Sequence, residues 1–181
     1  MRRTRGTIAF GTPDTGFVAA RREKYWNSEP DAQYVYNGRD YEDLVSRFPG
    51  DSLAAEASYA LTFLDIAGEC EGSVDCYLTR DGGPLEQFLR RYPASAHAAD
   101  AVQRLTDVYV TVFEFAPQQG DIWDVDSARV SAQVFGVDSV ITALPDALRA
   151  AGYTKLIRVM NAWHRPDRAR EMTNWLASRR P

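Results

Sequence analysis

The apolar positions of this chain recur mostly with the spacing of an α-helix, and the clearest case follows His97. One face of that stretch stays apolar over several turns and carries Ala98, Ala101, Val102, Leu105, Val108, Tyr109, Val112 and Phe113. Residues three and four positions apart share a helix face, so the pattern predicts a long amphipathic helix that ends near Pro117. The β-branched residues in its second half would also suit a strand, but the unbroken spacing favours the helix.

One segment of the pattern occurs twice. Tyr41–Leu61 reads YEDLVSRFPGDSLAAEASYAL, and Leu85–Leu105 reads LEQFLRRYPASAHAADAVQRL. The copies match at the aromatic-proline pairs Phe48-Pro49 and Tyr92-Pro93 and in the alanine-rich run that follows each pair. Proline disfavours helix at the preceding residue, so we expect the first helix of each copy to end at the aromatic residue. Self-similarity at such a period is typical of stacked helical hairpins.

The polar residues after each proline predict how the second helix of the hairpin begins. Asp51 or Ser52 in the first copy, and Ser95 in the second, can accept hydrogen bonds from the free N–H groups of the next helix. Glu56 and Asp100 come early in that helix, where the helix dipole favours negative charge. Each copy therefore predicts a helix, an aromatic-proline turn and an alanine-rich helix.

Proline and glycine residues predict where the other helices of the N-terminal part stop. Residues 1–12 show no period and are expected to form an extended arm. The run from Asp14 to Tyr25 can form a short helix that Pro30 ends. Asp81-Gly82-Gly83-Pro84 predicts a loop and then a helix start, with the proline in the first turn.

The C-terminal part has helical spacing but does not repeat the duplicated text. Asp126 can cap a helix that breaks near Gly136. Pro145 either kinks the next apolar run or begins a new helix, and Gly152 is expected to close that segment. Two further helices follow, separated by His164-Arg165-Pro166. A degenerate third hairpin with a capping helix would fit, because repeat arrays have atypical ends.

The text FPGDSLAAEA, echoed by YPASAHAADA, resembles the tetratricopeptide-like repeats of bacterial envelope proteins. The nearest types are the outer-membrane-assembly lipoproteins and the periplasmic Tol-Pal-associated coordinator proteins. The resemblance covers roughly Tyr41–Phe115; the lipoprotein cysteine is missing, and the loop between the copies is longer and carries two cysteines. It implies an all-α protein whose antiparallel helical hairpins stack as a TPR-like right-handed superhelix.

We expect a single α-helical domain over residues 1–181, a length that can bury a substantial core. Within it, residues 1–30 would form the arm and the short helix, and residues 31–116 the two TPR-like repeats. Residues 117–181 would form a C-terminal helical capping region.

Charge and hydropathy exclude some classes of partner. The net charge is -4 and the basic residues are dispersed, which gives no electrostatic footprint for nucleic acid. No apolar run is long enough to span a bilayer. Thr7–Phe10 is too short for the apolar core of a secretory leader. The resemblance implies a periplasmic or cell-envelope protein whose leader has been removed, and a cytoplasmic protein is the alternative.

The two cysteines allow two interpretations. Cys70 and Cys76 lie between the copies in ECEGSVDC, and they form either a disulfide or a pair of buried thiols. A disulfide would indicate an oxidising compartment. The spacing is not CxxC and no histidine is near, so the sequence predicts no metal site there.

Catalytic motifs give little support for an enzyme. GxSxG, HExxH, phosphate-binding and dinucleotide-binding motifs are absent from the sequence. His97 can share a helix face with Asp100, and Asp121, Asp124 and Asp126 form an acidic group without the glycine and glutamate of a calcium-binding loop. We expect no enzyme, cofactor or metal. The alternative is an all-helical hydrolase or lyase with its site at His97 and the Asp121–Asp126 loop.

The function that the pattern favours is protein–protein interaction. Stacked helical hairpins present a curved surface that holds a peptide or protein segment. Aromatic residues and arginines are enriched where binding energy concentrates, and the candidates for binding a protein partner are Tyr41, Arg47, Tyr59, Arg90, Arg91 and Trp123. The partner would be another protein or a peptide, and a scaffold or an immunity protein that inhibits a toxin would both fit.

Overall fold

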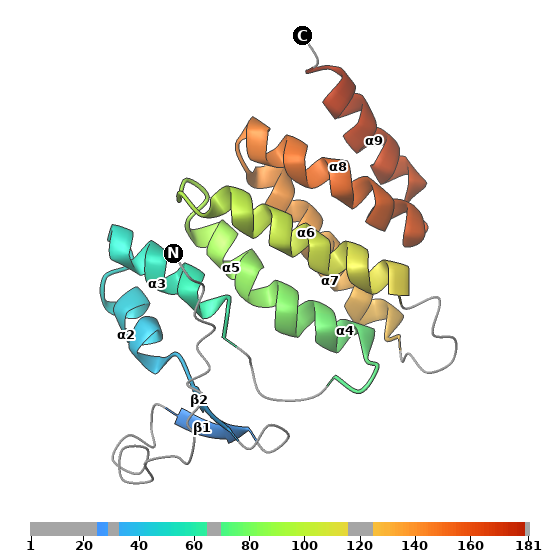
Figure 1. Ribbon diagram of the computed structural model, residues 1–181. Helices are drawn as coiled ribbons and strands as arrows, with labels where there is room; N and C mark the ends of the chain where they lie inside the picture. The colour runs from blue at the N-terminus through green and yellow to red at the C-terminus, as the bar shows by residue number, and fades with distance from the viewer. Residues whose placement is uncertain (1–24, 29–32, 65–69, 116–124, 180–181) are drawn as a thin grey trace. The chain divides into compact units, whose positions relative to one another are not determined.

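The computed structural model describes residues 25–28, 33–64, 70–115 and 125–179. The chain divides into two compact units, Met1–Glu69 and Cys70–Pro181, so the boundary falls between the two copies of the duplicated segment. Helices make up most of the described residues, which confirms the all-α prediction in its main feature (Figure 1). A small two-stranded ribbon in the first unit is the exception.

The described part of the first unit is the ribbon and one pair of helices. The elements are β1 (Tyr25–Ser28), β2 (Gln33–Tyr36), α2 (Arg39–Arg47) and α3 (Ser52–Leu61). The strands are antiparallel, with Tyr25 opposite Tyr36. The predicted helix from Asp14 to Tyr25 is therefore wrong at its end, because the aromatic and β-branched residues of both segments favour strand pairing. The rest of that predicted helix lies outside the described residues.

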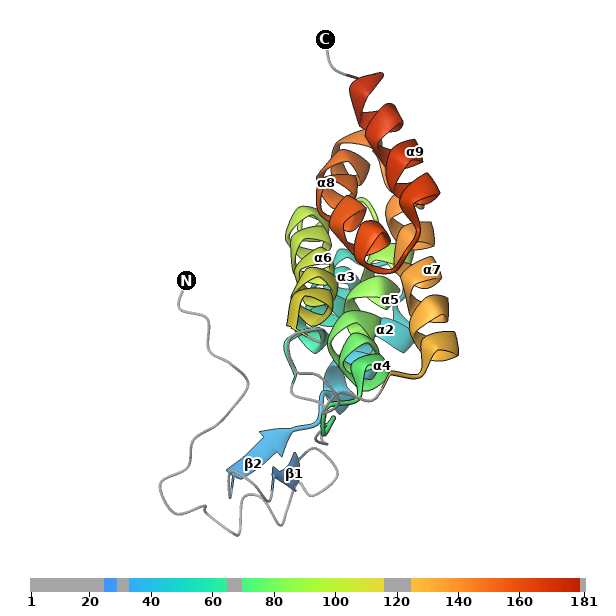
Figure 2. The same ribbon diagram turned by 90° about the vertical axis from the view of Figure 1, so that its right-hand side faces the viewer.

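Among its described residues the second unit consists of helices joined by turns and short loops. The helices are α4 (Val74–Tyr77), the π-helical η2 (Leu78–Gly82), α5 (Gly83–Arg91), α6 (Ala98–Phe115), α7 (Ser127–Ala143), α8 (Asp146–Ala162) and α9 (Pro166–Ala177). α5 packs on α6, α7 packs on α8, and α9 packs on α8. α5 also contacts α7, and α6 packs along α8, so two helical hairpins lie side by side (Figures 1 and 2).

The two aromatic-proline turns have the same backbone conformation. Phe48 follows α2 with φ -130° and ψ 53°, and Tyr92 follows α5 with φ -131° and ψ 55°. In each turn the carbonyl of the aromatic residue accepts a hydrogen bond from the backbone three residues later, from Asp51 at 2.9 Å and from Ser95 at 3.1 Å. The predicted helix ends at Phe48 and Tyr92 are confirmed, because the following proline disfavours helical geometry there.

Side-chain caps explain where three of the segments begin. The Asp51 carboxylate accepts the Leu53 N–H at 2.8 Å, so Asp51 rather than Ser52 caps α3. The Ser95 hydroxyl accepts the His97 N–H at 3.2 Å in the turn that leads into α6. Asp126 accepts two backbone N–H groups of the first turn of α7, at 3.1 and 3.0 Å, and its predicted role as a cap is confirmed.

A proline explains the change of geometry in the first long helix of the second unit. α4, η2 and α5 follow one another without a break, so the predicted loop at Asp81-Gly82-Gly83 is wrong. In an α-helix Pro84 would lack a hydrogen to donate, and its ring would clash with the carbonyl four residues earlier. The π-helical turn before it accommodates the ring. The helix continues because Leu78 and Leu85, on either side of the glycine pair Gly82-Gly83, are both buried.

Two glycines that the sequence predicted as helix ends lie inside helices. A Cβ on Gly152 in α8 would come within 2.5 Å of Ile141 Cγ2, and one on Gly136 in α7 would come within 3.2 Å of Glu86 Oε2. A glycine inside a helix costs only about 1 kcal/mol relative to alanine, so close packing at these positions can retain it. Pro145 directly precedes α8 and begins a new helix instead of kinking one.

Arg168 on α9 connects three helices. Its guanidinium donates to both oxygens of Asp138 on α7, at 2.7 and 2.8 Å. It also donates to the hydroxyls of Thr142 and Tyr153, each at 3.1 Å. The hydrogen bonds to Asp138 raise the pKa of Arg168. This network fixes α9 against both α7 and α8.

Of the two interpretations of the cysteine pair, the structure has the disulfide. Cys70 and Cys76 are bonded at 2.11 Å and close the turn that leads into α4. Cys70 is buried and precedes α4, and Cys76 lies within α4. The bond therefore ties the incoming chain to the first turn of the second unit.

Candidate functional site

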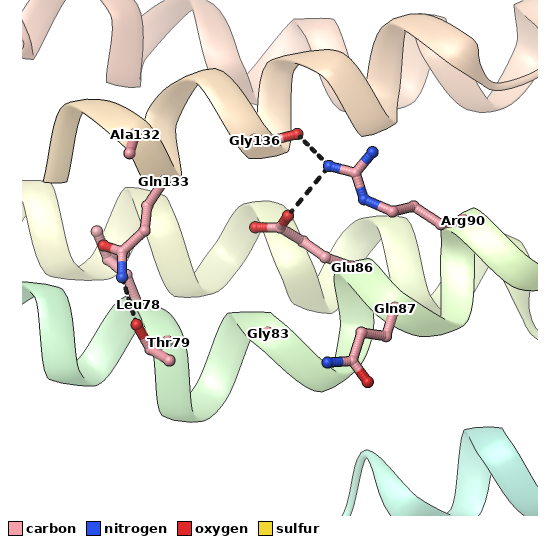
Figure 3. A pocket seen from close by; sticks show the side chains of 9 residues that line it. All are labelled: Leu78, Thr79, Gly83, Glu86, Gln87, Arg90, Ala132, Gln133 and Gly136. Atoms are coloured by element: carbon pink, nitrogen blue, oxygen red, sulfur yellow. Dashed lines mark hydrogen bonds and ion pairs between the residues drawn. The ribbon is translucent and has the colours of Figure 1, made fainter. Parts of the chain in front are cut away.

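A groove opens on the second unit between the first helices of its two hairpins. Its volume is about 330 Å³, and it is lined by Leu78, Thr79, Gly83, Glu86, Gln87, Arg90, Ala132, Gln133 and Gly136. The residues up to Arg90 belong to η2 and α5, and the others belong to α7 (Figure 3). Small residues on both walls keep the groove open, while a carboxylate, a guanidinium and two amides supply its polar groups.

Glu86 and Tyr109 form a hydrogen-bonded pair beneath the groove. Tyr109 of α6 is fully buried, and its hydroxyl lies 2.9 Å from Glu86 Oε1 and 3.1 Å from the backbone carbonyl oxygen of Gln133. A tyrosine hydroxyl can donate one hydrogen bond, and when Glu86 is ionised its carboxylate accepts that bond. When Glu86 is protonated it can donate to Tyr109, which is then free to donate to the Gln133 carbonyl. In both states Tyr109 connects α5, α6 and α7.

Burial raises the pKa values of both members of this pair. Burial raises the pKa of Glu86, and the Tyr109 hydrogen bond and the positive charge of Arg90 only partly counteract the rise. Burial also raises the pKa of Tyr109, and the neighbouring Glu86 adds to that rise. Tyr109 therefore stays protonated, and Glu86 is the member of the pair that titrates.

Arg90 crosses the groove from α5 to α7. Its Nη2 donates to the Gly136 carbonyl oxygen at 3.2 Å and lies 3.7 Å from Glu86 Oε2. The other terminal nitrogen points away from both groups (Figure 3). The side chain is 51% exposed, so Arg90 connects the two hairpins and still presents N–H donors at the surface.

Gln133 closes the other end of the groove. Its amide nitrogen donates to the Asp75 carbonyl oxygen at 2.9 Å and to the Thr79 hydroxyl. Its Oε1 is buried without a hydrogen-bond partner among the residues that the structure describes. Arg129 also reaches Asp75, at 3.4 Å. α7 is thus attached to the turn that the disulfide holds.

An aromatic and a cationic side chain stand at the rim beside the groove. Phe135 directly precedes the groove residue Gly136 and is 53% exposed. The guanidinium carbon of Arg165 lies 4.4 Å from the centre of the Phe135 ring, a cation–π contact. Within the described ranges, no carboxylate comes within 4.0 Å of the Arg165 guanidinium. We call Phe135, Arg165 and Arg90 the groove rim.

The structure separates the residues predicted to bind a partner. Arg90 lines the groove, and the Arg91 guanidinium lies 5.6 Å from the Tyr92 ring at the end of the same helix. The other three described candidates belong to the first unit: Tyr41, Arg47 and Tyr59. Trp123 lies outside the described residues. Of the five candidates that the structure describes, Arg90 is the one that lines the groove of the second unit.

The predicted catalytic alternative gains little from the geometry. His97 lies in the turn before α6 and Asp100 in its first turn, and neither lines the groove. Asp121 and Asp124 lie outside the described residues, while Asp126 caps α7. No cluster of three or more histidine, cysteine or acidic residues in the described ranges could hold a metal ion. In the same ranges, no helix has the length and apolar character needed to cross a bilayer.

The sequence analysis missed Glu86, Gln133 and Phe135. Tyr109 carried a usable signal, because a tyrosine within an apolar helix face needs a hydrogen-bond partner for its hydroxyl. Its partner Glu86 lies 23 residues earlier, and helix spacing does not link residues so far apart. Phe135 directly precedes Gly136, where the sequence predicts a helix break; because α7 is unbroken, Phe135 lies on its exposed face.

Comparison with protein-family models, with curated protein sequences and with solved structures finds no match to this chain.

Proposed function

We propose that this protein is a non-catalytic peptide-binding module. The groove between α5 and α7 is its binding site, and an extended segment of another protein is its ligand. The observation that carries the proposal is an open groove in which Glu86, Arg90 and Gln133 are held by hydrogen bonds, and whose rim carries an exposed phenylalanine, an exposed arginine and a partly exposed one.

The architecture supports this proposal. α5 and α7 are the first helices of neighbouring hairpins, and adjacent first helices of stacked hairpins form an extended surface suited to a peptide. The repeated aromatic-proline turn supports a TPR-like stack, because both copies make it with the same backbone geometry. The disulfide supports a location in an oxidising compartment such as the bacterial envelope.

The chemistry of the groove also suits binding more than catalysis. Burial raises the pKa of Glu86, as in many general acids, but Tyr109 hydrogen-bonds one of its carboxylate oxygens and Arg90 forms an ion pair with the other at 3.7 Å. The one hydroxyl among the described lining residues, that of Thr79, accepts a hydrogen bond from the Gln133 amide. Pre-fixed polar groups reduce the entropy lost on binding, so the groove can hold a peptide without reorganising.

Selection of peptides from a random displayed library, on the immobilised full-length protein, tests the proposal. Selected peptides are then titrated by fluorescence anisotropy against the wild type and Phe135→Ser. We expect about a tenfold weaker Kd for the variant, because an exposed aromatic anchor typically contributes over 1 kcal/mol. Val125→Ser, which alters another exposed residue of the second unit, is the control and should bind normally. Failure to enrich any peptide, or equal binding by Phe135→Ser, would contradict the proposal.

A further inference from the structure

We infer that the groove binds an acidic segment, in which a carboxylate contacts the arginines of the groove rim and a neighbouring apolar side chain packs on Phe135. The inference rests on the proposed peptide binding and specifies the class of peptide.

Arg165 is a cation without an acidic partner in the described part of the chain. It follows α8 and directly precedes α9, and its guanidinium stacks on the ring of Phe135. By contrast, its neighbours Arg168 and Arg170 both form ion pairs, with Asp138 at 2.7 Å and with Asp167 at 3.5 Å. Stacking fixes the plane of a guanidinium while its edge donors stay available. Arg165 can therefore offer paired N–H groups to a carboxylate beside the exposed ring.

Arg90 supplies a second cation next to the same turn of α7. It binds the carbonyl of Gly136, the residue after Phe135, so the two arginines contact consecutive residues of one helix. Glu86 does not neutralise the outer part of Arg90, because the carboxylate is largely buried and contacts only Nη2, at 3.7 Å. Both arginines thus favour a negatively charged ligand where they flank Phe135.

Carboxylates of α4, α7 and α9 form ion pairs with other arginines. Asp138 is held by Arg168 through both oxygens, and Glu171 accepts the third nitrogen of the same guanidinium at 2.7 Å. Asp75, at the far end of the groove, is paired with Arg129. An acidic peptide would therefore meet cations at the rim and few free carboxylates, whereas a basic peptide would meet Arg90 and Arg165 directly. Charge complementarity of this kind selects between partners.

The exposed face of α7 provides the apolar contact. From Ala132 to Ser139 its exposed positions carry no charge, and Phe135 is the large side chain among them. An apolar side chain next to the ligand carboxylate can cover this ring. The recognised element is thus an acidic residue adjacent to an apolar one.

The test uses short fluorescein-labelled glycine-serine peptides that carry paired aspartates beside a leucine, with matched peptides in which asparagine or lysine replaces aspartate. Binding to the full-length protein is measured by anisotropy at low and at physiological salt. We expect the aspartate peptide to bind about tenfold more tightly than the asparagine peptide, and the difference to shrink as salt rises. The lysine peptide should bind most weakly.

Variants of the protein locate the effect. Arg165→Gln and Arg90→Gln should each remove most of the preference for aspartate, and Arg170→Gln, an exposed substitution on α9, should not. Because Arg90 also connects the helices, Arg165→Gln is the decisive variant. The inference would be overturned if the aspartate and asparagine peptides bound equally well, or if none of the three peptides bound. The proposed function is judged independently by the library selection and by Phe135→Ser, so the two can fail separately.

Discussion

Replacing Tyr109 by phenylalanine tests whether the pair beneath the groove stabilises the second unit. The substitution keeps the ring that fills the core and removes the hydroxyl that lies 2.9 Å from Glu86 and 3.1 Å from the Gln133 carbonyl. Tyr109 is fully buried, so water cannot replace the lost donor without a rearrangement. We expect Tyr109→Phe to be folded but less stable.

The magnitude follows from the charge of the acceptor. A hydrogen bond to a charged group contributes about 1.5–3 kcal/mol, compared with about 0.5–1.5 kcal/mol for a neutral pair. For a chain of this size, 1 kcal/mol corresponds to about 2–4 °C in Tm, so the variant should melt about 3–12 °C lower when Glu86 is ionised. In a Glu86→Gln background the same substitution should cost only the neutral value.

The pH dependence gives a second check. Burial raises the pKa of Glu86 in the folded protein, so its contribution to stability is full below the ordinary carboxyl pKa and is lost as the pH rises through the raised value. The Tyr109 hydrogen bond limits that loss because it favours the ionised carboxylate. Tyr109→Phe should therefore be more destabilising at about pH 8 than at about pH 4.5. Glu86→Gln should remove most of this difference.

Tyr92→Phe is the matched control, and urea unfolding followed by circular dichroism at both pH values is the assay. The Tyr92 hydroxyl is buried with no hydrogen-bond partner among the described residues, so its removal should be neutral or stabilising at both pH values. If Tyr109→Phe costs no more than Tyr92→Phe, or costs the same at both pH values, the assignment of Glu86 and Tyr109 as a coupled pair is wrong.

Three further substitutions test the packing of the second unit. Gly152→Ala should destabilise by about 1–3 kcal/mol in thermal unfolding although alanine favours helix, because its Cβ would approach Ile141 Cγ2 to 2.5 Å. Arg168→Gln should cost about 3 kcal/mol, since it leaves a largely buried carboxylate without its cation. Replacing Cys70 and Cys76 by serine should cost about 2–3 kcal/mol from the entropy of a short loop, measured by urea unfolding of the oxidised wild type and the variant.

Each of these predictions has a control or an opposing result. For Gly152 the control is Gly136→Ala, whose Cβ would meet only the end of the flexible Glu86 side chain, at 3.2 Å. For Arg168 it is Arg170→Gln, an exposed ion pair whose loss should cost under about 1 kcal/mol. A cysteine-free variant as stable as the oxidised protein would show that the bond does not constrain the unfolded chain.

Helix positions were predictable wherever a local rule decided them. The aromatic-proline turns and the Asp126 cap follow from backbone sterics and from short-range hydrogen bonds, so the sequence is sufficient for both. A glycine after an apolar run is also the local signal of a helix end, so the sequence alone predicts helix ends at Gly136 and Gly152. The close approach of a neighbouring helix explains why both glycines lie within helices instead. At Pro84 burial on both sides keeps the helix intact through a π-turn, which local propensity does not predict.

The site was less predictable than the fold for a related reason. The sequence indicates Arg90 as a candidate because arginines are enriched where binding energy concentrates. Its role is set by Gly136, a residue 46 positions later. Phe135 lies in α7 and Arg165 in the turn between α8 and α9, and neither is unusual in its local sequence. Only the packing of the hairpins brings the cation onto the ring, so periodicity could not have identified the rim.

The residues beneath the groove, which we call its floor, stabilise the fold, whereas the groove rim is proposed to bind the peptide. Binding can therefore be tested separately from stability. Tyr109, Glu86 and Gln133 connect three helices under the groove, and the disulfide fixes the turn at one end. These contacts set the shape of the groove in the free protein. Phe135 is exposed, and Arg165 is partly exposed with no ion pair among the described residues, so changing them should alter affinity with little effect on unfolding. Tyr109→Phe should lower the stability but leave the peptide affinity unchanged when it is measured well below the Tm of the variant. The rim residues keep their positions as long as the protein is folded. A rim variant that unfolds the protein, or a floor variant that binds poorly while fully folded, would show that the two parts are not independent.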